Sequence, residues 1–262
     1  MIDADAPIRV RNEQAPWNAF SSQEYWRRNY ATVHPEDLEI IDRVSRFFLR
    51  AFSDRRRVQC AVDVGSGSNL YPALLMLPWT DQILLTDYSE PNVSWLSGQV
   101  MGDGPEWDWL PFWRELGKFK GYDQISEPQK QLRAACAPKP GSAGIERLSV
   151  FDLPAAKWQL GTMFFVAESI TQEYSEFCAA ISSFVRALQP GSPFAAAFMA
   201  GSRGYTVDRT SFPALQVTAD DVCKRFTELG ASELDVHLNR TSERVRPGYE
   251  GMIVATGIAG ER

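Results

Sequence analysis

The feature that most constrains the fold is a glycine-containing segment, Asp63-Val-Gly-Ser-Gly-Ser-Asn69, which directly follows a short apolar run at residues 59–64. That run has the length and β-branched content of a buried parallel strand. The glycines allow a sharp turn and the close approach of a ligand, and a helix predicted over residues 70–77 presents its N-terminus there. A second apolar run at residues 82–87 completes a strand–helix–strand unit, so the sequence predicts an α/β sheet.

The same alternation continues to the end of the chain. Further strands are predicted over residues 145–150, 162–167, 194–199, 233–238 and 252–257. Helices are predicted over residues 25–52, 174–188 and 219–229, the last with Thr218 as its N-cap, Asp221 three residues on and Gly230 at its end. The polar stretch between the last two strands predicts an antiparallel hairpin. We therefore expect a mostly parallel, seven-stranded, doubly wound sheet with helices on both faces.

The length of the chain and a change in its composition indicate how this fold is organised along the sequence. We expect one domain over residues 1–262, with residues 1–52 as an N-terminal helical lid. Residues 98–144 interrupt the alternation with three tryptophans, Trp107, Trp109 and Trp113, and many glycines and prolines. This segment is predicted to be an insertion that lies over the edge of the sheet or its ligand crevice.

Composition excludes several classes of function. The net charge of −6 argues against a nucleic-acid partner, because phosphate binding normally requires an excess of lysine and arginine. The four cysteines lie far apart with no nearby histidine cluster, so neither a disulfide framework nor a metal site is expected. We find no signal peptide and no apolar run near the roughly 20 residues of a membrane helix. A cytoplasmic monomer or homodimer without membrane or nucleic-acid partners is expected.

Asp87, at the end of the second predicted strand, indicates the kind of ligand. It lies 22 residues after Gly65, the spacing at which a carboxylate accepts hydrogen bonds from both ribose hydroxyls of an adenosine-bearing cofactor. A dinucleotide-binding loop would carry a third glycine beneath the pyrophosphate, and Leu70 occupies that position. An adenosyl cofactor without phosphates fits better, with Asp63 near its amino-acid portion.

At this point the sequence resembles a known family. Residues 63–71 and 86–92 look like the core of the nicotinamide, phenylethanolamine and thioether methyltransferases, which include indolethylamine N-methyltransferases. Further matches, in the same order along the chain, are Tyr25, Asn29-Tyr30-Ala31, Trp107 to Trp109, Gln131-Leu132-Arg133 and Asp152. The resemblance covers the chain from about Tyr25 to the C-terminus. It implies a Rossmann-like class I methyltransferase that uses S-adenosyl-L-methionine and releases S-adenosyl-L-homocysteine.

Carried over by position, the family pattern implies a cofactor site. Three tyrosines would close over the cofactor, Asp87 would take the ribose, and Asp152 and Leu153 would flank the adenine. The implied cofactor-binding residues are Tyr25, Tyr30, Asp63, Gly65, Ser66, Gly67, Tyr71, Asp87, Tyr88, Asn92, Asp152, Leu153 and Ala167.

The resemblance also implies an acceptor pocket, with one departure. Glu168 and Tyr25 are the implied catalytic residues, and the pocket would be lined by Tyr25, Glu168, Phe198, Ser202 and Tyr205. Phe198 aligns with a position where the nicotinamide enzymes carry an acid. Losing that carboxylate disfavours a cationic or amide-donor ligand and favours an apolar or aromatic acceptor.

The expected activity is transfer of a methyl group to a nitrogen or sulfur atom of a small aromatic or heterocyclic molecule, in specialised metabolism. His34 and His237 lie away from these motifs, so a histidine base is not expected. Two alternatives remain open: a nicotinamide-dependent oxidoreductase with the same fold, and a non-catalytic binding protein that retains the methyltransferase fold.

Overall fold

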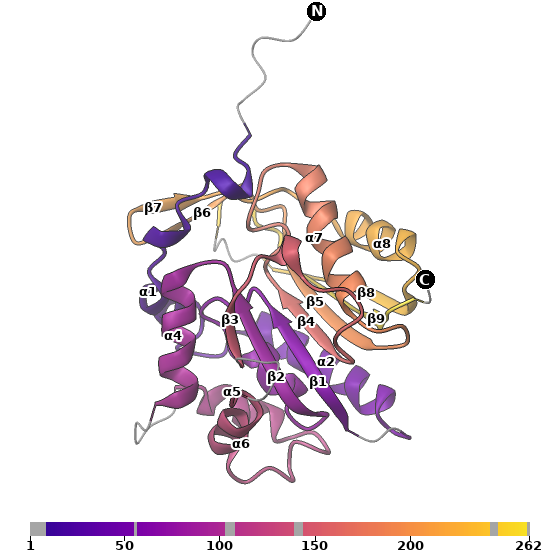
Figure 1. The fold of residues 1–262 in the computed structure, drawn as a ribbon. Coiled ribbons are helices and arrows are strands. Elements are labelled where there is room, and N and C mark those ends of the chain that lie inside the picture. Colours follow the sequence, from indigo (N-terminus) through magenta and orange to yellow (C-terminus); the bar gives the residue numbers. More distant parts are fainter. Residues whose placement is uncertain (1–8, 55–56, 103–107, 139–143, 242–245, 261–262) are drawn as a thin grey trace, which may run out of the picture.

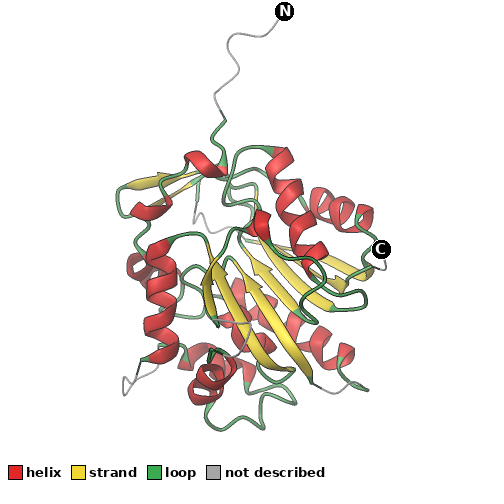
Figure 2. Ribbon diagram, viewed as in Figure 1, coloured by secondary structure: helices red, strands yellow, loops and turns green. Residues whose placement is uncertain are grey.

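The computed structural model describes residues 9–54, 57–102, 108–138, 144–241 and 246–260. A seven-stranded sheet, in the order β3-β2-β1-β4-β5-β9-β8, forms its centre (Figures 1 and 2). The strands are β1 (Val58–Val64), β2 (Thr80–Asp87), β3 (Ile145–Arg147), β4 (Gly161–Phe164), β5 (Pro193–Ala200), β8 (Ser232–Arg240) and β9 (Gly251–Ile258). β9 runs antiparallel to both of its neighbours, β5 and β8, whereas the other neighbouring strands in this sheet are parallel. The predicted α/β class, the mostly parallel sheet and the final hairpin are confirmed.

Helices cover both faces of the sheet because its strands are buried on both sides. One face packs on α2 (Pro35–Ala51), α3 (Tyr71–Met76), α4 (Glu90–Met101), α5 (Leu110–Leu116) and α6 (Pro128–Ala135). The other face packs on α7 (Tyr174–Ala187) and α8 (Ala219–Glu228). In β5 the residues alternate between these faces: Met199 faces the α2 side, whereas Phe198 faces the α7 side.

The prediction of a single helix over residues 25–52 is wrong, because the chain forms two helices in this region. α1 spans Ser22–Asn29, and α2 begins at Pro35. Proline disfavours helical conformation in the residue before it, and His34 is accordingly extended, with φ −86° and ψ 156°. The break leaves α1 free to pack against α4.

The tryptophan-rich segment packs beside the sheet. Its described part continues α4 and forms α5 and α6, with α6 against β2 and α4 against β2 and β3 (Figure 1). Trp109 and Phe112 are fully buried there, and Phe112 stacks on Tyr71 with 5.1 Å between ring centroids. Trp107 lies outside the described residues. Within the described part of the chain, no helix combines the length and apolar character needed to cross a membrane.

The N-terminal cap predicted for α8 is present, and its contribution to stability can be tested by mutation. Thr218 Oγ1 accepts a hydrogen bond from the backbone N–H of Asp221, at 3.2 Å, and Asp221 Oδ2 accepts one from the backbone N–H of Thr218, at 2.9 Å. We expect Thr218→Ala to lower the free energy of unfolding by about 1 kcal/mol, measured by urea denaturation. Thr227→Ala, an exposed position in the same helix, is the control. Equal losses in both variants would contradict a specific capping role.

Candidate active site

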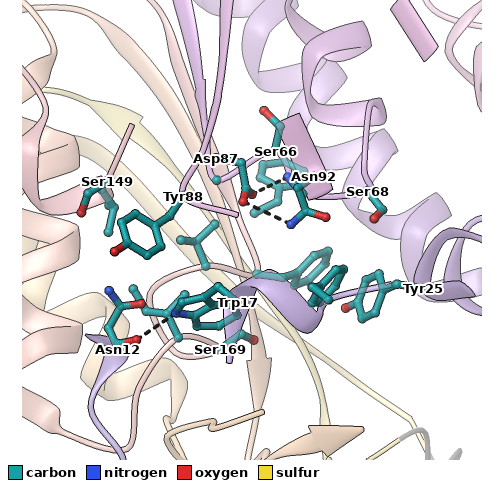
Figure 3. Close-up of a pocket in the computed structure, with 18 of the residues that line it drawn as sticks. Asn12, Trp17, Tyr25, Ser66, Ser68, Asp87, Tyr88, Asn92, Ser149 and Ser169 are labelled. Atoms are coloured by element: carbon teal, nitrogen blue, oxygen red, sulfur yellow. Dashed lines mark hydrogen bonds between the residues drawn. The ribbon is translucent and has the colours of Figure 1, made fainter. Parts of the chain in front are cut away.

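A cavity that is partly open to solvent lies at the carboxyl ends of β1, β2 and β4 (Figure 3). We call it the main cavity. Asp87 and Asn92 lie near its middle, with Tyr88 and Ser149 to one side and Tyr25 to the other (Figure 3). This is the edge where open α/β sheets bind ligands.

The glycine loop forms one wall of the main cavity and requires its glycines. Gly65 and Gly67 have positive φ angles of 66° and 56°, which side chains disfavour. A Cβ atom at Gly65 would also lie only 2.5 Å from Cγ2 of Val166. Without side chains at Gly65 and Gly67, the loop leaves its backbone, Ser66 and Ser68 lining the main cavity, where a ligand can approach closely.

Asp87 is held rigidly at the middle of this wall. Its Oδ2 accepts a hydrogen bond from the backbone N–H of Gly67, at 2.9 Å. Its Oδ1 accepts bonds from the backbone N–H of Ser89, at 2.8 Å, and from Nδ2 of Asn92, at 3.1 Å. Burial raises the pKa of this carboxyl, and these three donors counter the rise. Asn92 Oδ1 also accepts a bond from Ser22 Oγ, at 2.7 Å, which ties α1 to the site.

Several predicted cofactor residues lie behind the wall instead of on it. Asp63 is fully buried and accepts a bond from Thr162 Oγ1, at 2.7 Å, and burial raises its pKa to about 7. Tyr71 is equally buried. Asp152, Leu153 and Ala167 do not line the main cavity. The neighbouring residues Leu148, Ser149 and Val150 do.

The N-terminal segment supplies an aromatic wall that the sequence reasoning partly missed. Tyr25 and Tyr30 were predicted, whereas Asn12, Trp17 and Phe20 were not, and all five line the main cavity. Two short strands, β6 (Tyr205–Val207) and β7 (Thr210–Phe212), support this wall, since Trp17 and Tyr205 both stack on Phe212 at 5.4 Å between ring centroids. The sequence offered one signal for Trp17 and Phe20 as cavity residues: aromatic residues cluster there in a segment that lacks the periodicity of a helix.

A buried arginine, also missed, joins α1 to the loop that follows β4. Arg246 is 8% exposed and precedes β9 in the loop that was predicted only as a connection. Its Nη2 donates to the hydroxyl of Tyr25 at 2.6 Å, and its Nη1 donates to Ser169 Oγ at 3.3 Å. Its guanidinium carbon lies 4.4 Å from the ring centroid of Tyr205, a cation–π geometry.

Glu168 lies at the other end of this network and lines no cavity described here. It is fully buried, and its Oε1 accepts bonds from Ser169 Oγ, at 2.9 Å, and from the backbone N–H of Met199, at 3.0 Å. Burial raises the pKa of its carboxyl, and these donors and the positive charge of Arg246 oppose the rise. The chain Glu168–Ser169–Arg246–Tyr25 places a carboxyl group and a guanidinium group on either side of one serine.

The residues predicted for an acceptor pocket are not all brought together. Tyr25 and Tyr205 line the main cavity. Phe198 lies in the core on the opposite face, 6.1 Å from Phe177 and 6.4 Å from Phe226 between ring centroids. Ser202 is fully buried, and like Glu168 it lines neither cavity described here.

A second cavity, also partly open to solvent, adjoins the main cavity. The two share Tyr25, Tyr30 and Phe165 as a common wall. The remaining residues that line the second cavity are Arg28, Asn29, His34, Glu36, Asp37, Met199, Tyr249 and Met252. Of the residues that line the second cavity, only Tyr25 and Tyr30 were predicted from the sequence to lie at the site.

Known proteins were compared with the chain by sequence and by fold. Human nicotinamide N-methyltransferase is 21% identical over 218 residues, which are 80% of this chain and 81% of that protein. Magnesium protoporphyrin IX methyltransferase from Synechocystis PCC 6803 has a similar fold, with a TM-score of 0.54 at 13% identity over 93% of this chain and 96% of that one. A SAM-dependent methyltransferase from Methanosarcina mazei has a TM-score of 0.53 at 11% identity over 88% of this chain and 100% of that one. These structures have the class I methyltransferase fold that the sequence predicted.

The match to a family model is more extensive than any of these pairwise similarities. The model of the NNMT/PNMT/TEMT family matches residues 10–256, nearly the whole chain, including the glycine loop and Asp87. The resemblance inferred from the sequence is thereby confirmed, and the chain belongs to the NNMT/PNMT/TEMT family.

Proposed function

We propose that the chain transfers a methyl group from S-adenosylmethionine to a nitrogen or sulfur atom of a small acceptor. The observation that carries this proposal is the position of Asp87. Its carboxyl group is held beside the glycine loop by the backbone N–H of Gly67 and lines the middle of the main cavity. Ribose hydroxyls at Asp87 would direct the adenine toward Tyr88 and Ser149 and the methionine part toward Tyr25 and Ser68 (Figure 3).

The lining of the main cavity supports a cofactor without phosphates. No lysine or arginine is among the described residues that line it, whereas a pyrophosphate would call for such cations or a third loop glycine. Apolar side chains, Leu148 and Val150, lie where an adenine ring would pack. These features disfavour a nicotinamide dinucleotide and hence the oxidoreductase alternative.

The second cavity is our proposed acceptor site. The two cavities meet at Tyr25, Tyr30 and Phe165, so the reacting atom of an acceptor there would have to reach the cofactor's methyl group between these three side chains. Two of these residues belong to the N-terminal region that we propose as a lid. The described part of the 98–144 segment lines neither cavity, so the proposed lid does not include it.

The protein's contribution to the reaction would be alignment and exclusion of water. When bound, the cofactor supplies an electrophilic methyl group on a sulfonium sulfur. Asp87 and the glycine loop would fix the cofactor, and the aromatic wall would hold the acceptor atom in line and keep water out. Such positioning can lower the barrier by roughly 7–11 kcal/mol in favourable cases, so no covalent intermediate with the protein is required.

Calorimetric titration tests the proposal directly. We expect S-adenosylhomocysteine to bind and NAD not to bind under the same conditions. Tight binding of NAD alone would overturn the proposal. Incubating the protein with labelled S-adenosylmethionine and a panel of amines, N-heterocycles and thiols then tests catalysis. Binding of the cofactor without turnover of any panel member would favour the non-catalytic alternative.

A further inference from the structure

Asn12, in the N-terminal segment, lies at the end of the main cavity where we propose that the adenine binds. It lines the cavity on the same side as Tyr88 and Ser149, with its side-chain amide pointing toward Tyr88 (Figure 3). Asp152, the acid expected from the sequence to receive the exocyclic amine of adenine, does not line the main cavity. Ser149 Oγ already accepts a hydrogen bond from the backbone N–H of Phe151, at 3.1 Å. The amide of Asn12 is therefore a candidate acceptor for this amine.

The backbone of Asn12 is held on both sides, which fixes the direction of its side chain. Its N–H donates to Glu176 Oε2 of α7 at 2.9 Å, and its carbonyl oxygen accepts from Nε1 of Trp17 at 2.8 Å (Figure 3). Two residues earlier, the N–H of Val10 donates to Gln172 Oε1 at 3.0 Å, and the carbonyl of Val10 accepts from the N–H of Gln172 at 2.8 Å. The segment is thus fastened to the start of α7 and to the aromatic wall.

The side-chain amide of Asn12, by contrast, remains available to a ligand. It is half-buried at the cavity wall and forms no hydrogen bond with another residue in the described part of the chain. An asparagine amide carries an acceptor oxygen beside a donor nitrogen. Adenine presents the complementary pair, the N–H of its exocyclic amine beside a ring nitrogen that accepts, and an asparagine amide can bind this pair with two hydrogen bonds.

We propose that Asn12 determines specificity for the base of the cofactor: its side-chain oxygen accepts the exocyclic amine of adenine, and its side-chain nitrogen donates to the adjacent ring nitrogen. This rests on the proposed function, since the cofactor's orientation follows from Asp87. Recognition of the base then comes from the N-terminal segment instead of from Asp152. Because Asn12 is bonded to Trp17, a bound adenine would also stabilise the segment that carries the aromatic wall.

Two ligands test the proposal: S-adenosylhomocysteine, and the same molecule with unsubstituted purine in place of adenine, which lacks only the exocyclic amine. Each is titrated into the protein by calorimetry. We expect the wild-type protein to prefer S-adenosylhomocysteine by about 10-fold, and Asn12→Ala to reduce this preference to about 2-fold or less. Asn12→Asp should retain the preference but bind both ligands more weakly, because a carboxylate accepts the amine and cannot donate to the ring nitrogen.

Asn18→Ala is the matched control, because Asn18 is an exposed asparagine of the same segment that lines neither cavity. It should leave both affinities unchanged. A wild-type protein that binds the two ligands equally would overturn the proposal even if Asn12→Ala does not fold. Equal weakening of both ligands in Asn12→Ala, with the preference intact, would also overturn it, by limiting Asn12 to holding the segment in place. Failure of the wild-type protein to bind S-adenosylhomocysteine would instead contradict the proposed function.

Discussion

Asp87→Ala should reduce the affinity for S-adenosylhomocysteine by about 100-fold or more. Two ribose hydroxyls would lose a charged acceptor, and hydrogen bonds to charged groups contribute about 1.5–3 kcal/mol each. The same carboxylate also holds the backbone N–H of Gly67, so the loop would lose its anchor at the cavity. Isothermal titration calorimetry measures this loss, and no turnover should be detectable at cofactor concentrations that saturate the wild-type protein.

Asp81→Ala provides a control within the same strand. Asp81 lies at the opposite end of β2, where its exposed carboxylate pairs with Arg57 at 3.0 Å. Exposed ion pairs contribute little, so neither cofactor affinity nor the fold should change measurably. Nearly unchanged affinity in Asp87→Ala, with the protein still folded, would exclude the ribose assignment and with it the orientation proposed for the cofactor.

The cofactor half of the site was predictable because its signals are local in the sequence. The turn from β1 into α3 needs glycine at Gly65 and Gly67, and β2 ends in Asp87 one strand later. Both features follow from the parallel strand–helix–strand unit itself, in which neighbouring strands end at the same edge. The fold class was predictable for the same reason, since alternating buried strands and helices repeat along the chain.

The proposed acceptor part of the site is formed by residues that lie far apart in the sequence, so no local sequence pattern predicts it. Arg246 reaches Tyr25 across 221 residues, and Asp37 reaches the second cavity only because Pro35 breaks the predicted helix. Phe198 was misplaced because alternation along β5 decides which face a residue occupies, and a shift of one residue reverses that face. Met199, its neighbour, is the residue that lines the second cavity.

Arg246→Met should lower the free energy of unfolding by about 3 kcal/mol at pH 8, because it leaves the buried carboxylate of Glu168 without its counter-charge. The effect should shrink as the pH falls. The pKa of Glu168 is already raised by burial, and loss of Arg246 raises it further above that of the unfolded chain. The folded variant can hold Glu168 in its protonated, uncharged form. The variant therefore keeps its stability at pH values below the pKa that Glu168 has in the unfolded chain, and it loses stability as the pH rises through the higher pKa that Glu168 has in the folded protein. Urea denaturation at pH 5 and pH 8 measures the difference.

A double-mutant cycle with Glu168→Gln separates charge pairing from catalysis. If the two side chains compensate each other through Ser169, the double variant should be more stable than the sum of the single effects by about 1–2 kcal/mol. Additive losses would show that Arg246 and Glu168 act independently. Turnover of Glu168→Gln across pH supplies the second readout: a rate profile like that of the wild-type protein would exclude Glu168 from the chemistry. The buried pair would then serve to hold Tyr25, through Arg246, at the wall shared by the two cavities.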